Sequence, residues 1–183
     1  MSPPASVEGR ERVRLFCALR LPEPVLQELA TWSNAHLAGR IVPRANLHIT
    51  LAFLGHQPTC RVDDICEAMR ASAAAAAPIE FALSRYRETR TAGMLVLDDR
   101  RRSGTALAGD LQRRLVELGV YEPENREWIP HVTAVRFKTR PRLRPGALPE
   151  LGTFVPSDAA VYLSRLRPSG AEYEVVQSFA LGG

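Results

Sequence analysis

Two short segments of similar pattern decide how this chain folds: NLHITLAFLG at residues 46–55 and IPHVTAVRF at residues 129–137. Each places a histidine, one apolar residue and a threonine within a run of apolar residues. A short apolar run bounded by turn residues is typical of a buried strand. The same polar pair therefore recurs in two predicted strands, separated by about half the length of the chain.

Residues two apart on a strand face the same side, so each HxT motif presents an imidazole and a hydroxyl to one ligand: His48 with Thr50, and His131 with Thr133. Two such strands facing each other would surround a small anion. One neutral histidine can take a proton from water, and the other, protonated, can give one to a departing oxygen. Threonine hydroxyls can bind phosphate oxygens. The motifs predict phosphoester chemistry without a metal or cofactor; the alternative is that each imidazole is a core residue bonded to a backbone carbonyl.

The elements around the motifs repeat in the same order. A predicted strand, an amphipathic helix and an HxT strand occur at residues 13–21, 22–37 and 46–55, and again at 93–99, 103–119 and 127–137. A further helix is expected at 60–77, and strands at 79–90, 152–168 and 171–181. The repeat predicts one domain, 1–183, built from two related lobes near 12–90 and 91–183, with residues 1–11 as a flexible tail.

The net charge of +4 and the pI of about 9.3 are compatible with an anionic partner. Lys138 is the only lysine, and the excess of arginine can equally reflect the composition of the source genome. No apolar run is long enough to span a membrane, and the start of the sequence has no signal-peptide pattern. Three cysteines are too few, and odd in number, for a disulfide scaffold, so a reducing cytoplasm is expected. The protein is also expected to be a monomer.

A metal site near His56 is a further hypothesis, because Cys60 and Cys66 follow it closely. Their spacing matches no standard zinc pattern. No metal ligands are therefore predicted.

Taken together, the two motifs and their flanks resemble the 2H phosphoesterases, and within them the RNA 2′,3′-cyclic phosphodiesterases, also called 2′–5′ RNA ligases. The likeness extends over nearly the whole chain. It includes RLFCALRLPEPV at 14–25, both HxT segments, and LSRLRPSGAEYEVVQSFAL at 163–181. In the second motif Ala134 and Val135 stand where the family commonly has Leu-Ala, and GMLVLDD lacks the Arg and Trp often found in that strand.

The resemblance implies an α+β fold in which two pseudo-symmetric lobes, each an antiparallel sheet with helices, face each other across a central cleft. It implies His48 and His131 as catalytic residues and Thr50 and Thr133 as phosphate-binding residues. Symmetry leaves the acid and base unassigned, and the resemblance favours His48 as the acid and His131 as the base.

The resemblance also suggests Phe53 as a stacking surface for a base and Arg136 as a cation that contacts substrate. Both lie five residues after their histidines, on the opposite parity of the strand. A bulge, a twist or a strand end is needed to bring them to the cleft. Otherwise Phe53 is a core residue and Arg136 a surface cation.

The implied function is hydrolysis of a terminal 2′,3′-cyclic phosphate on RNA to a 2′-phosphomonoester, with reversible 2′–5′ RNA ligation at the same site. The expected partners are RNA ends or nucleotides that carry a cyclic phosphate. Two alternatives remain: a noncatalytic module that binds RNA ends, and an enzyme acting on a small cyclic nucleotide or ADP-ribose cyclic phosphate.

Overall fold

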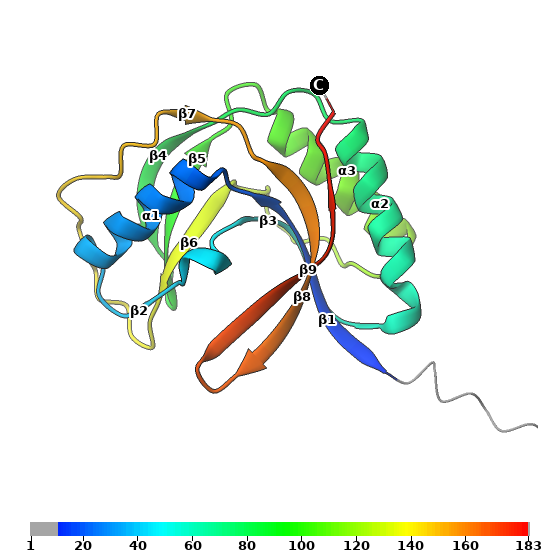
Figure 1. Cartoon of the computed structure of the whole chain (residues 1–183), viewed down its shortest axis with the longest axis horizontal. Coiled ribbons are helices and arrows are strands. Elements are labelled where there is room, and N and C mark those ends of the chain that lie inside the picture. Colours follow the sequence, from blue (N-terminus) through cyan, green and yellow to red (C-terminus); the bar gives the residue numbers. More distant parts are fainter. Residues whose placement is uncertain (1–10, 183) are drawn as a thin grey trace, which may run out of the picture.

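The computed structural model describes residues 11–182, which form an α+β fold around one curled antiparallel sheet (Figure 1). The helices are α1 (Glu23–His36), α2 (Val62–Ala74) and α3 (Ser103–Glu117), with short 3₁₀ turns η2 (Arg44–Asn46) and η3 (Thr59–Arg61). The strands are β1 (Arg12–Arg20), β2 (Arg40–Ile41), β3 (Ile49–Pro58), β4 (Phe81–Glu88), β5 (Ala92–Asp98), β6 (His131–Arg136), β7 (Thr153–Phe154), β8 (Asp158–Arg167) and β9 (Gly170–Phe179). All strand pairs are antiparallel, in the order β7-β4-β5-β6-β3-β1-β8-β9, and β2 pairs with β6.

The repeat seen in the sequence is visible in the sheet. The units β1-α1-β3 and β5-α3-β6 place their HxT strands side by side at the centre, where β3 pairs with β6. The α+β class and the antiparallel pairing are confirmed, and the two predicted sheets are halves of one continuous sheet.

The halves of the sheet are not the halves of the chain. β4 precedes residue 90 but pairs with β5, whereas β8 comes late in the chain and pairs with β1. The strand β2 had no counterpart in the sequence analysis, because two residues are too few to show a period. The predicted tail lies almost wholly outside the described residues.

The sheet has a helix-covered face and an open face. On β1, Leu15, Cys17 and Leu19 belong to the main core, whereas Phe16 and Ala18 belong to a smaller cluster on the other face. This alternation follows from the two-residue period of a strand. The open face carries the histidines, as the packing of Phe16 against His48 shows.

Helices α2 and α3 lie side by side over the half of the sheet that contains β1, β8 and β9, and α1 covers the other half (Figure 1). Helix α3 also reaches the site strand, because Gln112 Nε2 donates to the Leu51 carbonyl at 2.8 Å. Among the described residues, no helix is both long and apolar enough to cross a membrane.

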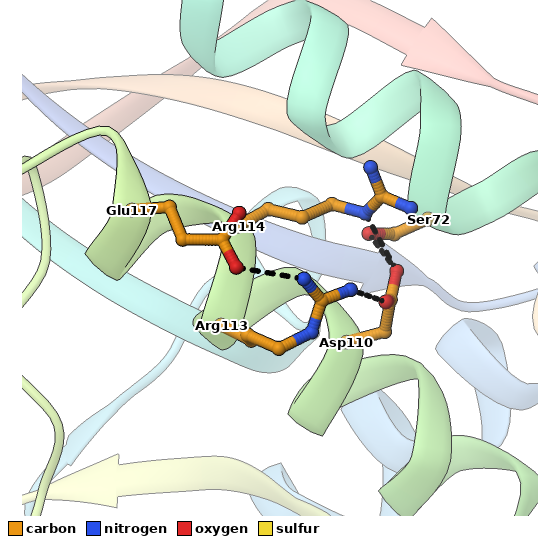
Figure 2. Close-up of polar contacts among 5 residues, drawn as sticks. All are labelled: Ser72, Asp110, Arg113, Arg114 and Glu117. Atoms are coloured by element: carbon orange, nitrogen blue, oxygen red, sulfur yellow. Dashed lines mark hydrogen bonds and ion pairs between the residues drawn. The ribbon is translucent and has the colours of Figure 1, made fainter.

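A polar cluster at Asp110 joins α2 to α3 (Figure 2). Ser72 Oγ of α2 and Arg114 Nε of α3 each donate to Asp110 Oδ2 at 2.8 Å, and Arg113 donates to Oδ1 at 2.5 Å and to Glu117 at 2.9 Å. Burial alone raises the pKa of Asp110, but the hydrogen bonds from Arg114, Ser72 and Arg113 outweigh it and lower the pKa to about 2. The charged carboxylate therefore stabilises the contact between the helices.

Candidate active site

The two HxT motifs meet through their middle residues. Ile49 pairs with Val132, and both side chains are buried in the core. In an antiparallel ladder the neighbours of a register pair lie on the opposite face, which here is the open face. His48 therefore lies on the side of Thr133, and Thr50 lies on the side of His131.

Each histidine is held in the same tautomer. His48 Nδ1 lies 2.7 Å from the Asn46 carbonyl oxygen, and His131 Nδ1 lies 2.8 Å from the Ile129 carbonyl oxygen. A carbonyl oxygen only accepts, so Nδ1 carries the hydrogen in both rings. In each neutral ring, Nε2 is thus the nitrogen without a hydrogen, and His48 Nε2 is 3.0 Å from Thr50 Oγ1.

His48 lies immediately before β3 rather than inside it, because the chain enters the strand from the turn η2. That turn supplies the Asn46 carbonyl which orients the ring. His131 instead is the first residue of β6. The expectation of a strand already at residue 46 was therefore a few residues too early.

Both strands carry a bulge three residues after the histidine. On β3, Ala18 pairs with Thr50 and Cys17 with Ala52, so Leu51 is the extra residue. On β6 the partners of Thr133 and Val135 are consecutive residues of β5, so Ala134 is extra in the same way. An extra residue reverses the parity of the strand beyond it.

The reversed parity brings Phe53 and Arg136 to the open face. Phe53 is 47% exposed, and Arg136 is also exposed. From each histidine to the fifth residue beyond it, the pattern of buried and exposed positions is the same in both motifs. The guanidinium carbon of Arg14 lies 4.5 Å from the centre of the Phe53 ring, so one face of the phenyl group is occupied.

A two-armed cleft runs over the motifs. One arm, about 390 Å³, contains His131, and the other, about 610 Å³, contains His48. The residues that line both arms are Thr50, Phe53, Thr133 and Arg136. All six candidate residues from the sequence thus lie at one cleft, with the threonines between the histidines.

His48 lies within an aromatic wall. Its ring centre is 4.8 Å from that of Phe16, 5.5 Å from that of Tyr173 and 6.1 Å from that of Tyr162, which is itself stacked on Phe16. Burial lowers the pKa of His48 to about 4, against the opposing effect of the Asn46 carbonyl, and the nearby His131 and Arg136 lower it further. In the ligand-free protein this imidazole is therefore neutral at pH 7.

His131 has a different, cationic environment. Burial lowers its pKa most, and the Ile129 carbonyl opposes this effect. The charges of Arg126, Arg136 and Arg87 lower the pKa further. An anion in the cleft would reverse these charge effects, so phosphate binding and imidazole protonation favour each other.

Some residues at the cleft were missed by the sequence analysis. Phe16 and Tyr162 were not singled out. The lining arginines Arg14, Arg40, Arg87 and Arg126 also had no recognisable pattern. Arg14 lies two residues before Phe16 on β1, but only the pairing of β1 with β3 places that strand beside the site.

In the part of the chain that the structure describes, the cleft contains neither the loop rich in arginine and proline that follows β6 nor a group of metal ligands. The buried carboxylate of Glu88 accepts hydrogen bonds from Arg140 Nε at 3.2 Å and from the Leu143 amide at 2.8 Å, which ties the Arg/Pro-rich loop at residues 138–150 to β4. The residues of this loop line neither arm of the cleft. Within residues 11–182, no three His, Cys, Asp or Glu side chains gather as a group that could hold a metal ion.

Comparison with known proteins shows which family the chain resembles over most of its length. A family model described as the 2′-5′ RNA ligase superfamily matches residues 21–162. An RNA 2′,3′-cyclic phosphodiesterase of Methanocaldococcus jannaschii is 23% identical over 176 residues, covering 91% of this chain and 100% of that protein. A protein of the same name from Geobacillus stearothermophilus is 28% identical over 186 residues, covering 94% of this chain and 59% of that protein.

Solved structures share the fold. The crystal structure of Escherichia coli LigT complexed with 3′-AMP aligns with a TM-score of 0.76 at 22% identity, covering 94% of this chain and 100% of that chain. At this identity the likeness concerns the arrangement of the backbone.

Proposed function

The chain belongs to the 2′-5′ RNA ligase superfamily of 2H phosphoesterases, and we propose that it hydrolyses terminal 2′,3′-cyclic phosphates of RNA to 2′-phosphomonoesters without a metal ion. The observation that carries this proposal is the pair of histidines, each with Nδ1–H donated to a backbone carbonyl. This leaves two Nε2 atoms for proton transfer at one cleft. The names of the relatives support the same substrate class.

The reaction needs one proton acceptor and one proton donor. A neutral imidazole takes a proton from water as the water oxygen bonds to phosphorus. The P–O3′ bond breaks, and an imidazolium gives its proton to O3′. The product keeps the phosphate on O2′. When an RNA 5′-hydroxyl attacks phosphorus in place of water, the same ring opening frees O3′ and forms a 2′–5′ bond.

We assign His48 as the acid and His131 as the base, following the family resemblance. The lowered pKa makes the His48 imidazolium a strong proton donor but leaves few such cations in the ligand-free protein. A bound phosphate anion supplies the missing charge and raises the pKa again. Substrate binding thereby loads the acid with its proton.

The other residues hold the substrate. Thr50 and Thr133 lie between the histidines and donate their hydroxyl hydrogens to the phosphate oxygens. Arg136 supplies positive charge for the anionic substrate, and Phe53 offers the free face of its exposed ring to a base. Both histidines come from one chain, so the proposal includes a single catalytic domain that acts as a monomer. The proposed location is the cytoplasm.

One assay separates this proposal from its alternatives. The purified chain is incubated with an RNA that ends in a 2′,3′-cyclic phosphate, in excess chelator, and the product is examined for a 2′-phosphate. Turnover in chelator supports the proposal. Activity that disappears in chelator and returns with one divalent ion would refute the metal-free mechanism.

Two further outcomes identify the alternatives. Tight binding without turnover would show a module that recognises RNA ends. Turnover of a cyclic mononucleotide or of ADP-ribose cyclic phosphate, with no turnover of RNA, would show a small-molecule enzyme. Size-exclusion chromatography with light scattering tests the monomer.

A further inference from the structure

Two arginines face each other beside the site without a carboxylate partner. Arg40 on β2 pairs directly with Arg136 on β6, so their side chains leave the sheet on the same face. Both are exposed, and neither has an ion pair within residues 11–182. Like charges directly opposite each other destabilise a strand pair. An anion bound between them would remove this repulsion.

The backbone is adapted to this arrangement. Gly39 has φ 127°, and a Cβ atom added there would lie 2.9 Å from the Arg136 carbonyl oxygen and 3.0 Å from Val135 Cγ2. Only a glycine lets β2 approach β6 so closely in this conformation. The chain therefore places Arg40 beside Arg136 through a position that tolerates no side chain.

Both guanidinium groups line the arm of the cleft that contains His48. Arg14 lines the same arm and is held by Ser164 Oγ at 2.8 Å. The carboxylate in the lining, Glu172, is paired with Arg167 at 3.1 Å. The arm thus has an excess of positive charge, which a second anionic group can neutralise.

The position of Arg40 and Arg136 suits a second phosphate of the nucleotide whose cyclic phosphate reacts. Because Ala134 is bulged, Arg136 lies only two register steps beyond Thr133, which is roughly 7 Å along the strand. Arg40 lies one strand further, roughly 5 Å away across the ladder. Water that attacks phosphorus in line with the departing O3′ comes from the side of the base, His131. The departing O3′ and its nucleoside therefore lie on the side of the acid, His48.

We propose that Arg40 and Arg136, with Arg14 in the lining of the same arm, form a second phosphate subsite. It binds the phosphate on O5′ of the nucleoside whose 2′,3′-cyclic phosphate reacts. This inference rests on the proposed function. It makes the preferred substrate a nucleotide with two phosphates, either the last residue of an RNA chain or a free nucleotide phosphorylated at O5′.

The test compares three substrates: adenosine 2′,3′-cyclic phosphate, the same nucleotide with a 5′-phosphate, and a diadenosine dinucleotide that ends in the cyclic phosphate. The measured quantity is the ratio of kcat/KM for each two-phosphate substrate to that for the one-phosphate substrate. One charge-assisted contact corresponds to about a tenfold ratio or more. Arg40→Ala removes one of these contacts and should lower this ratio by about tenfold.

Arg101→Ala is the matched control, because Arg101 is exposed, has no ion pair within the described residues, and lines neither arm. It should keep the wild-type ratio. A ratio near one in the wild type, or an equal loss of kcat/KM on all three substrates in Arg40→Ala, would overturn the subsite. A high ratio for the dinucleotide assigns the second phosphate to RNA, and a high ratio for the 5′-phosphorylated nucleotide alone assigns it to a free nucleotide.

A binding measurement separates failure of the subsite from failure of the proposed function. If no substrate is turned over, calorimetry compares adenosine 3′,5′-bisphosphate with 3′-AMP. Tighter binding of the bisphosphate, lost in Arg40→Ala, supports the subsite although the activity is absent. Equal affinities for the two ligands would refute the subsite.

Discussion

Ile49 and Val132 pair across β3 and β6, and each is the middle residue of an HxT motif. Their side chains are 0% and 1% exposed. In each motif the histidine and the threonine face the cleft, and the residue between them is packed into the core on the opposite face of the sheet. Core packing therefore sets the spacing between the two halves of the candidate active site.

Shortening Ile49 tests this coupling. Ile49→Ala should lower the free energy of unfolding by about 2–5 kcal/mol, because it leaves a cavity under the central strand pair. Ile49→Val should lower it by about 1 kcal/mol and keep near-normal turnover. Urea unfolding and steady-state kinetics measure both effects. An Ile49→Ala variant with unchanged stability would contradict the packing described here.

Removing either histidine should abolish most of the activity. His48→Ala and His131→Ala should each lower kcat by on the order of 10²–10⁴, since each removes one proton carrier. The double variant should lose far less than the product of the single losses, because the residues act as a unit. His56→Ala is the control, since this side chain is exposed and lines neither arm. Near-normal turnover by either folded single variant would show that the motifs are structural.

The pH dependence of the rate should be a bell that moves when substrate binds. Burial lowers the pKa of both histidines in the ligand-free protein, that of His48 to about 4. A bound phosphate anion raises both pKa values. The bell for kcat, which reports the complex, should therefore lie at higher pH than the bell for kcat/KM, which reports the free enzyme. Coincident bells would argue against loading of the acid by substrate.

Stability should decrease with acid in two separate windows. The pKa of His48 is lower in the folded state, about 4, than its ordinary value of 6.5, so its contribution is lost as pH falls from 6.5 towards 4. The loss is at most about 3 kcal/mol. The pKa of Asp110 is about 2 against an ordinary 3.8, so its contribution is lost below pH 3.8. Denaturant unfolding from pH 8 to pH 4 should show a flatter profile for His48→Gln, and an unchanged profile would contradict the burial effect.

Arg136 should matter for binding of anionic substrate. Arg136→Ala should lower kcat/KM for an RNA ending in cyclic phosphate by about tenfold or more, because a charge-assisted contact to phosphate is lost. His36→Ala should have little effect, since His36 is an exposed residue of α1 that stacks on Trp32. Equal kinetics for the two variants would count against the cleft as the substrate site.

The bulges explain where the sequence analysis succeeded and where it could not. The order of the elements and the shared face of His48 and Thr50 follow from local periodicity. The place of Phe53 does not, because Leu51 reverses the parity of β3. Nothing in the letters LAF or AVR distinguishes a bulged strand from a regular one. The arginines opposite each other likewise depend on β2, a two-residue strand defined only by its partner.

The sequence by itself determined the repeated unit and the paired imidazole and hydroxyl groups, because side-chain direction along a strand depends on neighbouring residues alone. Its resemblance to the 2H phosphoesterases implied the α+β class. Only the tertiary structure decided that Ile49 meets Val132, that the cleft has two arms, and that Arg40 lies beside Arg136. Register, bulges and strand order depend on hydrogen bonds and core contacts between residues far apart in the chain. Those energies are shared among many pairs, so they have no signature in any short stretch of sequence.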